Sequence, residues 1–370
     1  MANPKKIFIA ATQQNDGKTT ISLGLIFNLV ERFKKIGFIK PIGQRYLEEE
    51  GQKVDEDSIL IEKVCVPCGI KCGIKDMSPI AVERGFTEKY IVLPQKERIT
   101  SQIKDAYARV AEDKDLVIIE GTGHAGVGSV FDHSNAYVAN LLGSKVILIS
   151  SGGIGRPIDE IILNQALFEK EGVELLGVII NKVIPEKYDK VSKLVREGLK
   201  RKGIEVLGVI PYYPFLSSPT ISQIMEETDF KLLTGKESLS NRAESIIVGA
   251  MEPHDALNYI KDNSLVITPG DRDDMIMTVL SFYFIKAKSE KNFTISGLIL
   301  TGGMAPHPKI MEIIVESKIP VLLADGDTYT VANQVHDLTV KLMPQDKEKI
   351  KTVVRMVGEF VDIDRMVKEM

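Results

Sequence analysis

The chain has 370 residues, of which 44% are hydrophobic and 26% are charged. This composition supports buried cores, and the length suggests about two domains at roughly 100–200 residues each. The net charge of −4 shows no basic excess, so we expect no nucleic-acid partner. No apolar run reaches the ~18–20 residues of a membrane span, and the N-terminal MANPKKIFIA lacks a cleavage pattern. We therefore expect a cytoplasmic protein without membrane contact.

Short apolar strands alternate with amphipathic helices along the first half of the chain. Residues 5–10 form the first expected strand, and residues 18–34 the first helix. Five further strands are expected in IGFIKPI, DLVIIEG, KVILISS, LLGVIINKV and IEVLGVIPY. This order predicts an α/β fold with a mostly parallel sheet and helices on both faces.

The alternation weakens at residues 212–220, which are rich in Pro and Ser, and it resumes with NSLVITPG, FTISGLILTGG and IPVLLAD. We therefore place a first domain at residues 1–225 and a second, smaller α/β domain at residues 240–345. A charged helical tail is expected at residues 346–370.

The segment IAATQQNDGKTT lies between the first strand and the first helix and ends like a phosphate-binding loop. Gly17 permits a close approach of backbone to phosphate, and Lys18 supplies charge for the terminal phosphates. The Thr19 hydroxyl would bind Mg²⁺, and Thr20 supports the start of the helix. Where most such loops have their first glycine, this chain has Thr12. We predict an ATP and Mg²⁺ site rather than a chance polar loop, and we expect the Lys18 side chain to be exposed.

The loop ATQQNDGKTT resembles that of dethiobiotin synthetase, in which threonine also takes the place of the first glycine. Further segments are similar to that family in the same order over about residues 5–220. These segments are IKPIG (39–43), DLVIIEGTGHAGVG (115–128), GVIINKV (177–183) and LGVIP (207–211). The resemblance implies a P-loop NTPase-like fold and a dimer with the site near the subunit interface.

The resemblance also implies roles for individual residues. Glu120, at the end of a predicted strand, would bind Mg²⁺, and Lys40 would face the substrate side of the phosphate. Asp57 resembles a second metal-binding acid, although the neighbouring Asp55 and Glu56 are alternatives, and the whole run is consistent with a charged surface loop.

The nucleotide is expected to contact both the loop and a later strand. Asn181 would read adenine through its amide, and Lys182 would cover the ring. The loop residues that we expect to bind nucleotide are Thr12, Gln13, Asn15, Asp16, Gly17, Lys18, Thr19 and Thr20.

Gln13 departs from the synthetase pattern, which has an aspartate directly after the loop threonine. A neutral amide at that position weakens Mg²⁺ binding, so full synthetase chemistry is less well supported than nucleotide binding.

Residues 126–157 resemble the N-terminal part of the long bacterial phosphate acetyltransferases. ITPGDRDDMI (267–276) and LTGG (300–303) resemble the DRTGG domain that follows in those enzymes. Those enzymes carry a further catalytic domain, whereas this chain stops at Met370. The resemblance therefore implies the accessory half without the half that transfers acetyl groups.

The remaining polar candidates have ordinary interpretations beside functional ones. Cys65, Cys68 and Cys72 lie within eight residues and either ligate a metal ion or are plain loop residues, which we favour. His124 either contacts a substrate or is a polar loop residue.

In the second domain, two strand ends carry polar residues. Asp271 or Asp273 is expected to cap a helix, and Arg272 with Thr301-Gly302-Gly303 would either form an anion pocket or shape tight turns.

Two functions from different classes fit these observations. We favour a regulatory or accessory nucleotide-binding protein whose second domain senses a small-molecule effector or holds a partner. The alternative is an ATP-dependent ligase that phosphorylates a carboxylate, as in dethiobiotin synthetase and the similar cobyrinic acid diamide synthases. Gln13 counts against the ligase.

Overall fold

The computed structural model describes residues 4–49, 51–66, 72–289 and 293–370. It divides into two compact units, one formed by Met1–Tyr212 with Leu342–Met370 and the other by Tyr213–Lys341. The first unit is discontinuous in sequence, because the chain returns to it after completing the second.

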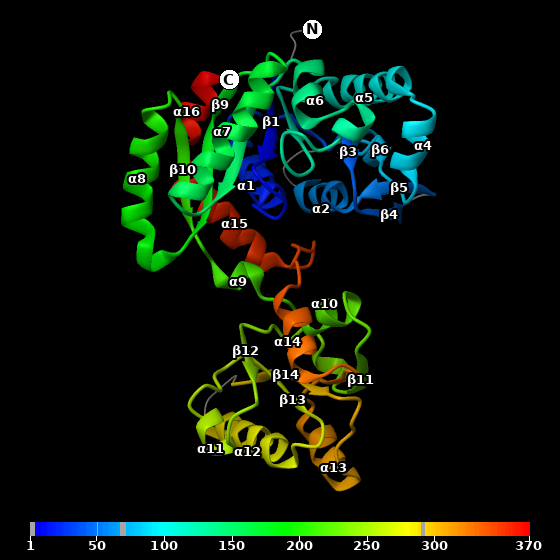
Figure 1. Cartoon of the computed structure of the whole chain (residues 1–370), viewed down its shortest axis with the longest axis vertical. Helices are drawn as coiled ribbons and strands as arrows, with labels where there is room; N and C mark the ends of the chain where they lie inside the picture. The colour runs from blue at the N-terminus through cyan, green and yellow to red at the C-terminus, as the bar shows by residue number, and fades with distance from the viewer. Residues whose placement is uncertain (1–3, 50, 67–71, 290–292) are drawn as a thin grey trace. The chain divides into compact units, whose positions relative to one another are not determined.

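The first unit is built on a six-stranded parallel sheet in the order β10-β9-β8-β1-β7-β2 (Figure 1). Its strands are β1 (Lys5–Ala11), β2 (Ile36–Ile39), β7 (Leu116–Glu120), β8 (Lys145–Ser151), β9 (Leu175–Val183) and β10 (Val206–Pro211). The four middle strands are almost continuously buried, as expected where helices cover both faces of a parallel sheet. The α/β prediction is confirmed.

Helices cover both faces of this sheet. One core joins the strands to α5 (Lys96–Ala111), α6 (Asn135–Leu141), α7 (Gly155–Lys170) and α8 (Tyr188–Lys200). The helix α1 (Lys18–Leu29) lies outside this core and contacts the strands β1 and β7 of the same sheet. The first helix ends at Leu29 rather than at residue 34, because the chain must turn before β2 begins at Ile36.

The C-terminal segment forms α15 (Lys347–Phe360) and α16 (Ile363–Glu369) and packs within the first unit. The amide of Asn28 on α1 donates to the carbonyl of Val354 on α15 at 2.9 Å. The backbone of Gly24 lies directly against Val357. The helix that follows the phosphate loop is therefore held by the last part of the chain.

Short elements complete the first unit. Two small sheets pair β3 (Ile42–Gly43) with β6 (Ile80–Ala81), and β4 (Tyr46–Glu49) with β5 (Gln52–Asp55). The short helices are α2 (Glu56–Cys65), α3 (Ile74–Met77), α4 (Phe86–Val92), and single turns at Ser129–Phe131 and Pro185–Lys187. Asp55 caps α2, because its side chain accepts from the N–H of Asp57.

The second unit has a five-stranded sheet in the order β11-β15-β14-β13-β12, with only β11 antiparallel. Its strands are β11 (Lys231–Thr234), β12 (Ser245–Val248), β13 (Ser264–Pro269), β14 (Ile295–Thr301) and β15 (Val321–Leu323). One core joins the sheet to α11 (Pro253–Ala256), α12 (Asp273–Ser289) and α13 (Pro308–Ser317). A second core joins it to α10 (Ile221–Glu226) and α14 (Thr328–His336). The helix α9 (Pro214–Ser217) and a turn at Lys236–Ser238 complete the unit.

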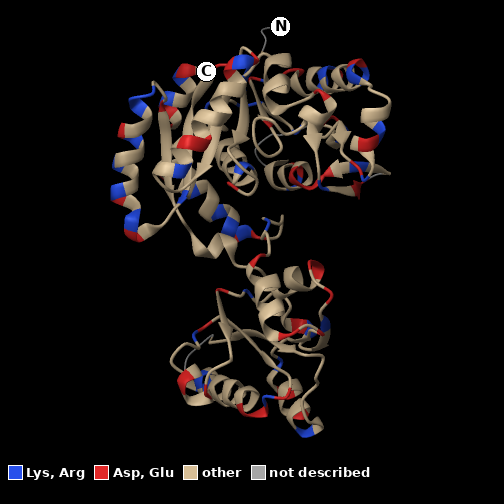
Figure 2. Cartoon of the chain, viewed as in Figure 1, with Lys and Arg blue, Asp and Glu red and all other residues tan. Residues whose placement is uncertain are grey.

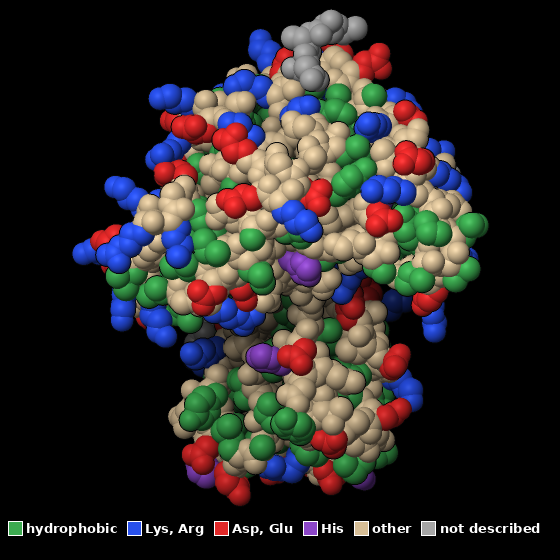
Figure 3. Space-filling view, turned by 45° about the horizontal axis from the view of Figure 1, so that its top comes forward, with side chains coloured by type: hydrophobic (Ala, Val, Ile, Leu, Met, Phe, Trp, Pro, Cys, Tyr) green, Lys and Arg blue, Asp and Glu red, His purple; other side chains and the backbone are tan. Residues whose placement is uncertain are grey.

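Charged side chains of both signs are interspersed along the helices (Figure 2) and over the face drawn in Figure 3. Among the helices of the described residues, none combines the length and hydropathy that a bilayer crossing requires.

The contact between α1 and α15 gives a stability prediction. A Cβ added at Gly24 would lie 2.3 Å from Val357 Cγ2 and 3.2 Å from the Val353 carbonyl oxygen. Gly24→Ala should lower the free energy of unfolding by about 1–3 kcal/mol through overpacking, which outweighs the ~1 kcal/mol gain in helix propensity. Urea denaturation measures it, with Gly155→Ala as the control because a Cβ there meets no atom within 4 Å. Equal effects of the two substitutions would contradict the packing argument.

Candidate functional site

The predicted site residues gather at the carboxyl ends of the parallel strands. The phosphate loop follows β1, Lys40 follows β2, and Glu120 ends β7. Ser150 lies near the end of β8 and Asn181 near the end of β9. Open α/β sheets bind ligands at this edge, because loops from neighbouring strands meet there.

The phosphate loop turns sharply into α1 at Gly17. Gly17 has φ of 100° and Asn15 has φ of 63°, so both residues adopt left-handed conformations. A Cβ at Gly17 would lie 2.4 Å from Nδ2 of Asn181. Glycine is therefore required at position 17 both by the backbone conformation and by the Asn181 side chain at the end of β9.

Asp16 holds the loop from the inside. Its Oδ2 accepts from the N–H of Gln13 at 2.8 Å and lies 2.9 Å from the hydroxyl oxygen of Thr12. Its Oδ1 accepts from the hydroxyl of Ser151. The Thr12 hydroxyl oxygen also lies 3.0 Å from Ser150 Oγ. Threonine thus has a structural use at the position where a glycine was expected.

Lys18 is buried, so the expectation of an exposed lysine is wrong. It belongs to the first turn of α1, and only 9% of it is accessible. Burial lowers the pKa of the Lys18 ammonium from its ordinary value, while nearby Glu120 opposes that shift. The reason for the error is that α1 packs against the sheet from its first residue.

Lys40 lies among three carboxylates. Its ammonium is 2.9 Å from Oδ1 of Asp55 and 3.7 Å from Oε1 of Glu120, and it also donates to Asp57. Burial opposes the charge on Lys40, but Asp57, Asp55 and Glu120 together raise its pKa above the ordinary value. The structure therefore brings Lys40, Asp57 and Glu120 together with Asp55, which the sequence offered as an alternative to Asp57.

Glu120 is fully buried, and its two oxygens differ. Oε1 accepts from the Thr19 hydroxyl at 2.8 Å, whereas Oε2 has no hydrogen-bond partner among the described residues. Burial raises the pKa of Glu120 to about 7, opposed by Lys40 and assisted by Asp57. A buried acceptor without a partner is costly unless a ligand supplies a bond. Glu120 is thus poised toward a cation or a donor next to Thr19.

Within the described ranges, no three His, Cys, Asp or Glu side chains form a cluster suited to a metal ion. The acids of this site instead surround the Lys40 ammonium.

Asn181 and Lys182 contact the loop itself. Asn181 Nδ2 donates to the carbonyl of Asp16 at 2.8 Å, and its Oδ1 accepts from the N–H of Lys182 at 2.9 Å. Lys182 Nζ donates to the carbonyl of Asn15 at 2.6 Å, and burial lowers its pKa. Both residues therefore position the loop, and their contact with adenine stays a prediction.

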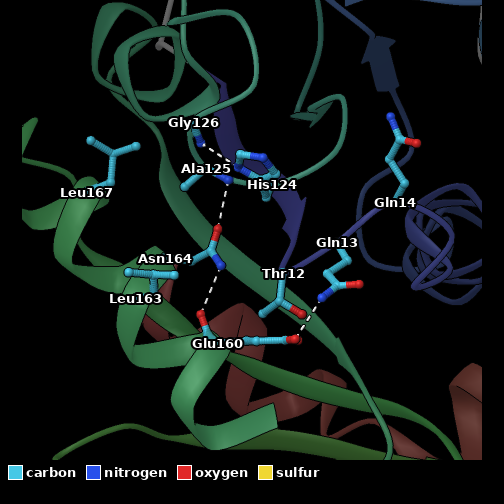
Figure 4. Close-up of a pocket in the computed structure, with 10 residues that line it drawn as sticks. All are labelled: Thr12, Gln13, Gln14, His124, Ala125, Gly126, Glu160, Leu163, Asn164 and Leu167. Atoms are coloured by element: carbon cyan, nitrogen blue, oxygen red, sulfur yellow. Dashed lines mark hydrogen bonds between the residues drawn. The ribbon is translucent and has the colours of Figure 1, made fainter. Parts of the chain in front are cut away.

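Gln13 contacts α7, and a pocket opens beside it (Figure 4). Gln13 Nε2 donates to Oε1 of Glu160 at 2.6 Å. The pocket has a volume of about 660 Å³ and is lined by the loop, by α7 and by the segment that contains His124. Residues Ser151 and Glu160 were not predicted. Their signals in the sequence are a serine pair at the end of a strand and an acid in the following helix.

The remaining candidates have local partners. Cys65 is buried and Cys72 is half-buried, with a pKa raised by burial, while Cys68 lies outside the described residues. In the second unit, Arg272 binds the carboxylate of Asp274 at 2.8 and 2.9 Å.

The backbone of the predicted anion loop in the second unit is also engaged. The N–H of Gly302 donates to Gly326, and the N–H of Gly303 donates to Ala324. Turn chemistry therefore accounts for these backbone groups.

Two family models cover most of the chain. Residues 5–220 match the AAA domain. This chain belongs to that family. Residues 223–338 match the DRTGG domain, so the AAA domain is followed by a second recognised domain. The predicted order of a P-loop domain and a DRTGG domain is confirmed.

Known relatives share the whole length of this AAA and DRTGG arrangement. The phosphate acetyltransferase of Pseudomonas putida is 27% identical over 96% of this chain, which corresponds to 50% of that protein. The chain thus spans about half the length of the relatives it matches.

Solved structures are similar at low identity. The septum site-determining protein MinD of Pyrococcus horikoshii, complexed with Mg-ADP, is 15% identical with a TM-score of 0.36, over 58% of this chain and 83% of that one. The CBS and DRTGG domains of a Clostridium perfringens pyrophosphatase, complexed with diadenosine tetraphosphate, are 19% identical with a TM-score of 0.26. That match covers 37% of this chain and 59% of that one.

The raised pKa of Glu120 predicts a pH dependence of stability. In the folded protein the pKa of the Glu120 carboxyl is about 7, whereas its ordinary value is 4.5. The free energy of unfolding contributed by Glu120 therefore falls as the pH rises from about 5 to about 7. Glutamine does not titrate, so Glu120→Gln should remove that fall. The free energy of unfolding of the variant should therefore rise relative to wild type by up to roughly 3 kcal/mol over this range.

Urea denaturation at the two ends of that pH range, in EDTA and without nucleotide, measures the difference. The exposed Glu112→Gln is the control, because its carboxylate lies outside the cluster. A difference between wild type and Glu120→Gln that stays constant with pH would contradict the assignment.

Proposed function

We propose that the AAA domain binds ATP with Mg²⁺ and that the chain is a regulatory or accessory ATPase. The observation that carries this proposal is the loop geometry at Gly17, followed by buried Lys18 and by Thr19 bonded to Glu120. A strand, a tight loop and a helix N-terminus with a lysine form the usual cradle for a polyphosphate. The ATP would be hydrolysed slowly, as suits a regulatory site.

The residues present fit a magnesium ion. The Thr19 hydroxyl, Glu120 and Asp57 would hold it, and the buried Oε2 of Glu120 would gain the partner that it lacks among the described residues. The ion would neutralise charge on the β and γ phosphates. Lys40 now pairs with the same acids, so its ammonium would turn toward a phosphate oxygen when the cation enters. Lys18 and Lys40 would then both face the nucleotide.

The second unit would sense a small-molecule effector or hold a partner. The match to the DRTGG domain supports this role, as does its position after the AAA domain. The relatives that share this arrangement are phosphate acetyltransferases. We therefore place the chain in regulation of acetyl transfer, as a cytoplasmic homodimer with the nucleotide sites near the interface.

An ATP-dependent ligase is the second candidate. The buried cluster around Lys40 supports it, because a lysine beside the terminal phosphate could position a carboxylate substrate. Gln13 weighs against it, since its side chain is bonded to Glu160 on α7 rather than to the acids of the cluster. Stimulation of ATP turnover by a small carboxylic acid would favour the ligase over the regulator.

Removal of the loop lysine tests nucleotide binding. Lys18→Ala should weaken ATP binding by about tenfold to a hundredfold, because a hydrogen bond between a charged group and phosphate contributes about 1.5–3 kcal/mol. Isothermal titration with ATP and Mg²⁺ measures this, and circular dichroism checks the fold. Lys63→Ala, at a half-exposed lysine of α2, is the control. Unaltered affinity in Lys18→Ala would overturn the phosphate-loop assignment.

Asn181 allows base recognition to be separated from loop positioning. Both ends of the Asn181 amide bond to backbone groups, so the side chain positions the loop whichever base is bound. Asn181→Ala should therefore weaken the binding free energy of ATP and of GTP by a similar amount, about 1 kcal/mol or more. Titration of wild type and variant with both nucleotides gives the ratio of ATP affinity to GTP affinity for each protein. A preference for ATP that disappears in the variant, with GTP affinity unchanged, would show instead that Asn181 reads the base.

A further inference from the structure

The pocket beside the phosphate loop has a wall that is already formed. Asn164 is buried on α7, where its Oδ1 accepts from the N–H of Ala125 at 2.8 Å. Its Nδ2 donates to the carbonyl of Glu160 at 2.8 Å. Figure 4 shows the first of these bonds joining α7 to the segment that follows β7, while the second lies within α7. A ligand would therefore meet a prearranged surface and would not have to order it.

Glu160 is the one carboxylate among the residues that line the pocket, and Arg156 pairs with it from outside the lining. The lining residues include neither lysine nor arginine. Glu160 Oε1 accepts from Gln13 Nε2 and from Arg156 Nε, each at 2.6 Å. Both of these bonds reach the same oxygen, Oε1. Because the Arg156 side chain is 74% exposed, solvent screens its pairing with Glu160. The pocket consequently favours a cationic group over an anionic one.

The opposite side of the pocket is apolar. Leu163 and Leu167 come from the same helix as Glu160, and Leu163 is 74% exposed. Figure 4 shows both leucines beside Asn164, away from Gln13. Covering an exposed leucine removes apolar surface from water, which stabilises binding of an alkyl group. The pocket thus pairs a carboxylate with an uncovered hydrocarbon surface.

We propose that this pocket binds a small primary amine with an alkyl body, which acts as an effector of the nucleotide site. The ammonium group binds Glu160, and the alkyl body lies across Leu163 and Leu167. The proposal rests on the proposed function, because the pocket shares Thr12, Gln13 and Gln14 with the phosphate loop. Binding of the amine affects the phosphate loop through the hydrogen bond between Glu160 and Gln13.

Three six-carbon probes test the charge preference on the full chain. Hexylammonium, hexan-1-ol and hexanoate share an alkyl body and differ in charge. In isothermal titration at neutral pH, hexylammonium should bind at least about fivefold more tightly than hexan-1-ol, because charge-assisted hydrogen bonds are stronger than neutral ones. Hexanoate should bind most weakly. Equal affinities of the amine and the alcohol, tighter binding of hexanoate, or no binding of hexylammonium would overturn the proposal.

Variants assign the binding to this pocket. Glu160→Gln should bring the affinity for hexylammonium down to that for hexan-1-ol, and Leu163→Ala should weaken both. Glu169→Gln, an exposed acid on the same helix, should keep the wild-type preference. An unchanged preference in Glu160→Gln would overturn the proposal.

Titration with ATP and Mg²⁺ on the same preparations separates this inference from the proposed function. If ATP binds and hexylammonium does not, the effector pocket alone fails. If hexylammonium binds and ATP does not, the nucleotide function fails and the pocket's effector role falls with it.

Discussion

The buried charge on Lys40 is the constraint on which the candidate site depends. An isolated buried ion costs several kcal/mol, so this lysine is tolerated only with its acids in place. Those acids come from separate parts of the chain, because Asp55 and Asp57 flank the start of α2 and Glu120 ends β7. The cluster therefore joins the segment after β2 to the end of β7, beside the loop that follows β1. Removal of Asp55 or Asp57 would take away a direct ion-pair partner of the buried Lys40 ammonium.

A second set of bonds gives the phosphate loop its shape. The Asp16 carboxylate accepts hydrogen bonds from Thr12, Gln13 and Ser151, while the Asn181 amide on β9 donates to the carbonyl of Asp16. These contacts fix the loop in its left-handed turn at Gly17. Preorganisation of this kind lowers the conformational cost of binding. It also explains why the loop functions structurally with a threonine in place of its first glycine.

The helix after the loop connects the site to the end of the chain. The chain leaves the first unit at Tyr212 and re-enters it at Leu342, and α15 then packs on α1 through Gly24 and Asn28. Since α1 begins at Lys18, the packing of α15 supports the same helix that presents the lysine and Thr19. Any effect of the second unit on the candidate site has a covalent route through this segment.

The sequence by itself predicted all strands of the six-stranded sheet, the strands β13, β14 and β15 of the second sheet, and the motif residues. Apolar runs of the strand period and the loop ending in Gly17-Lys18-Thr19 are local patterns, so local physics suffices to recognise them. Contacts between distant segments are different, because no local pattern specifies which side chains will meet. Three features depend on how β1 and β9 are placed in one sheet and on how α7 packs on that sheet. They are the burial of Lys18, the pairing of Gln13 with Glu160, and the use of the Asn181 amide by the loop. Only the tertiary structure decided those roles, since burial and hydrogen-bond partners are properties of the packed chain.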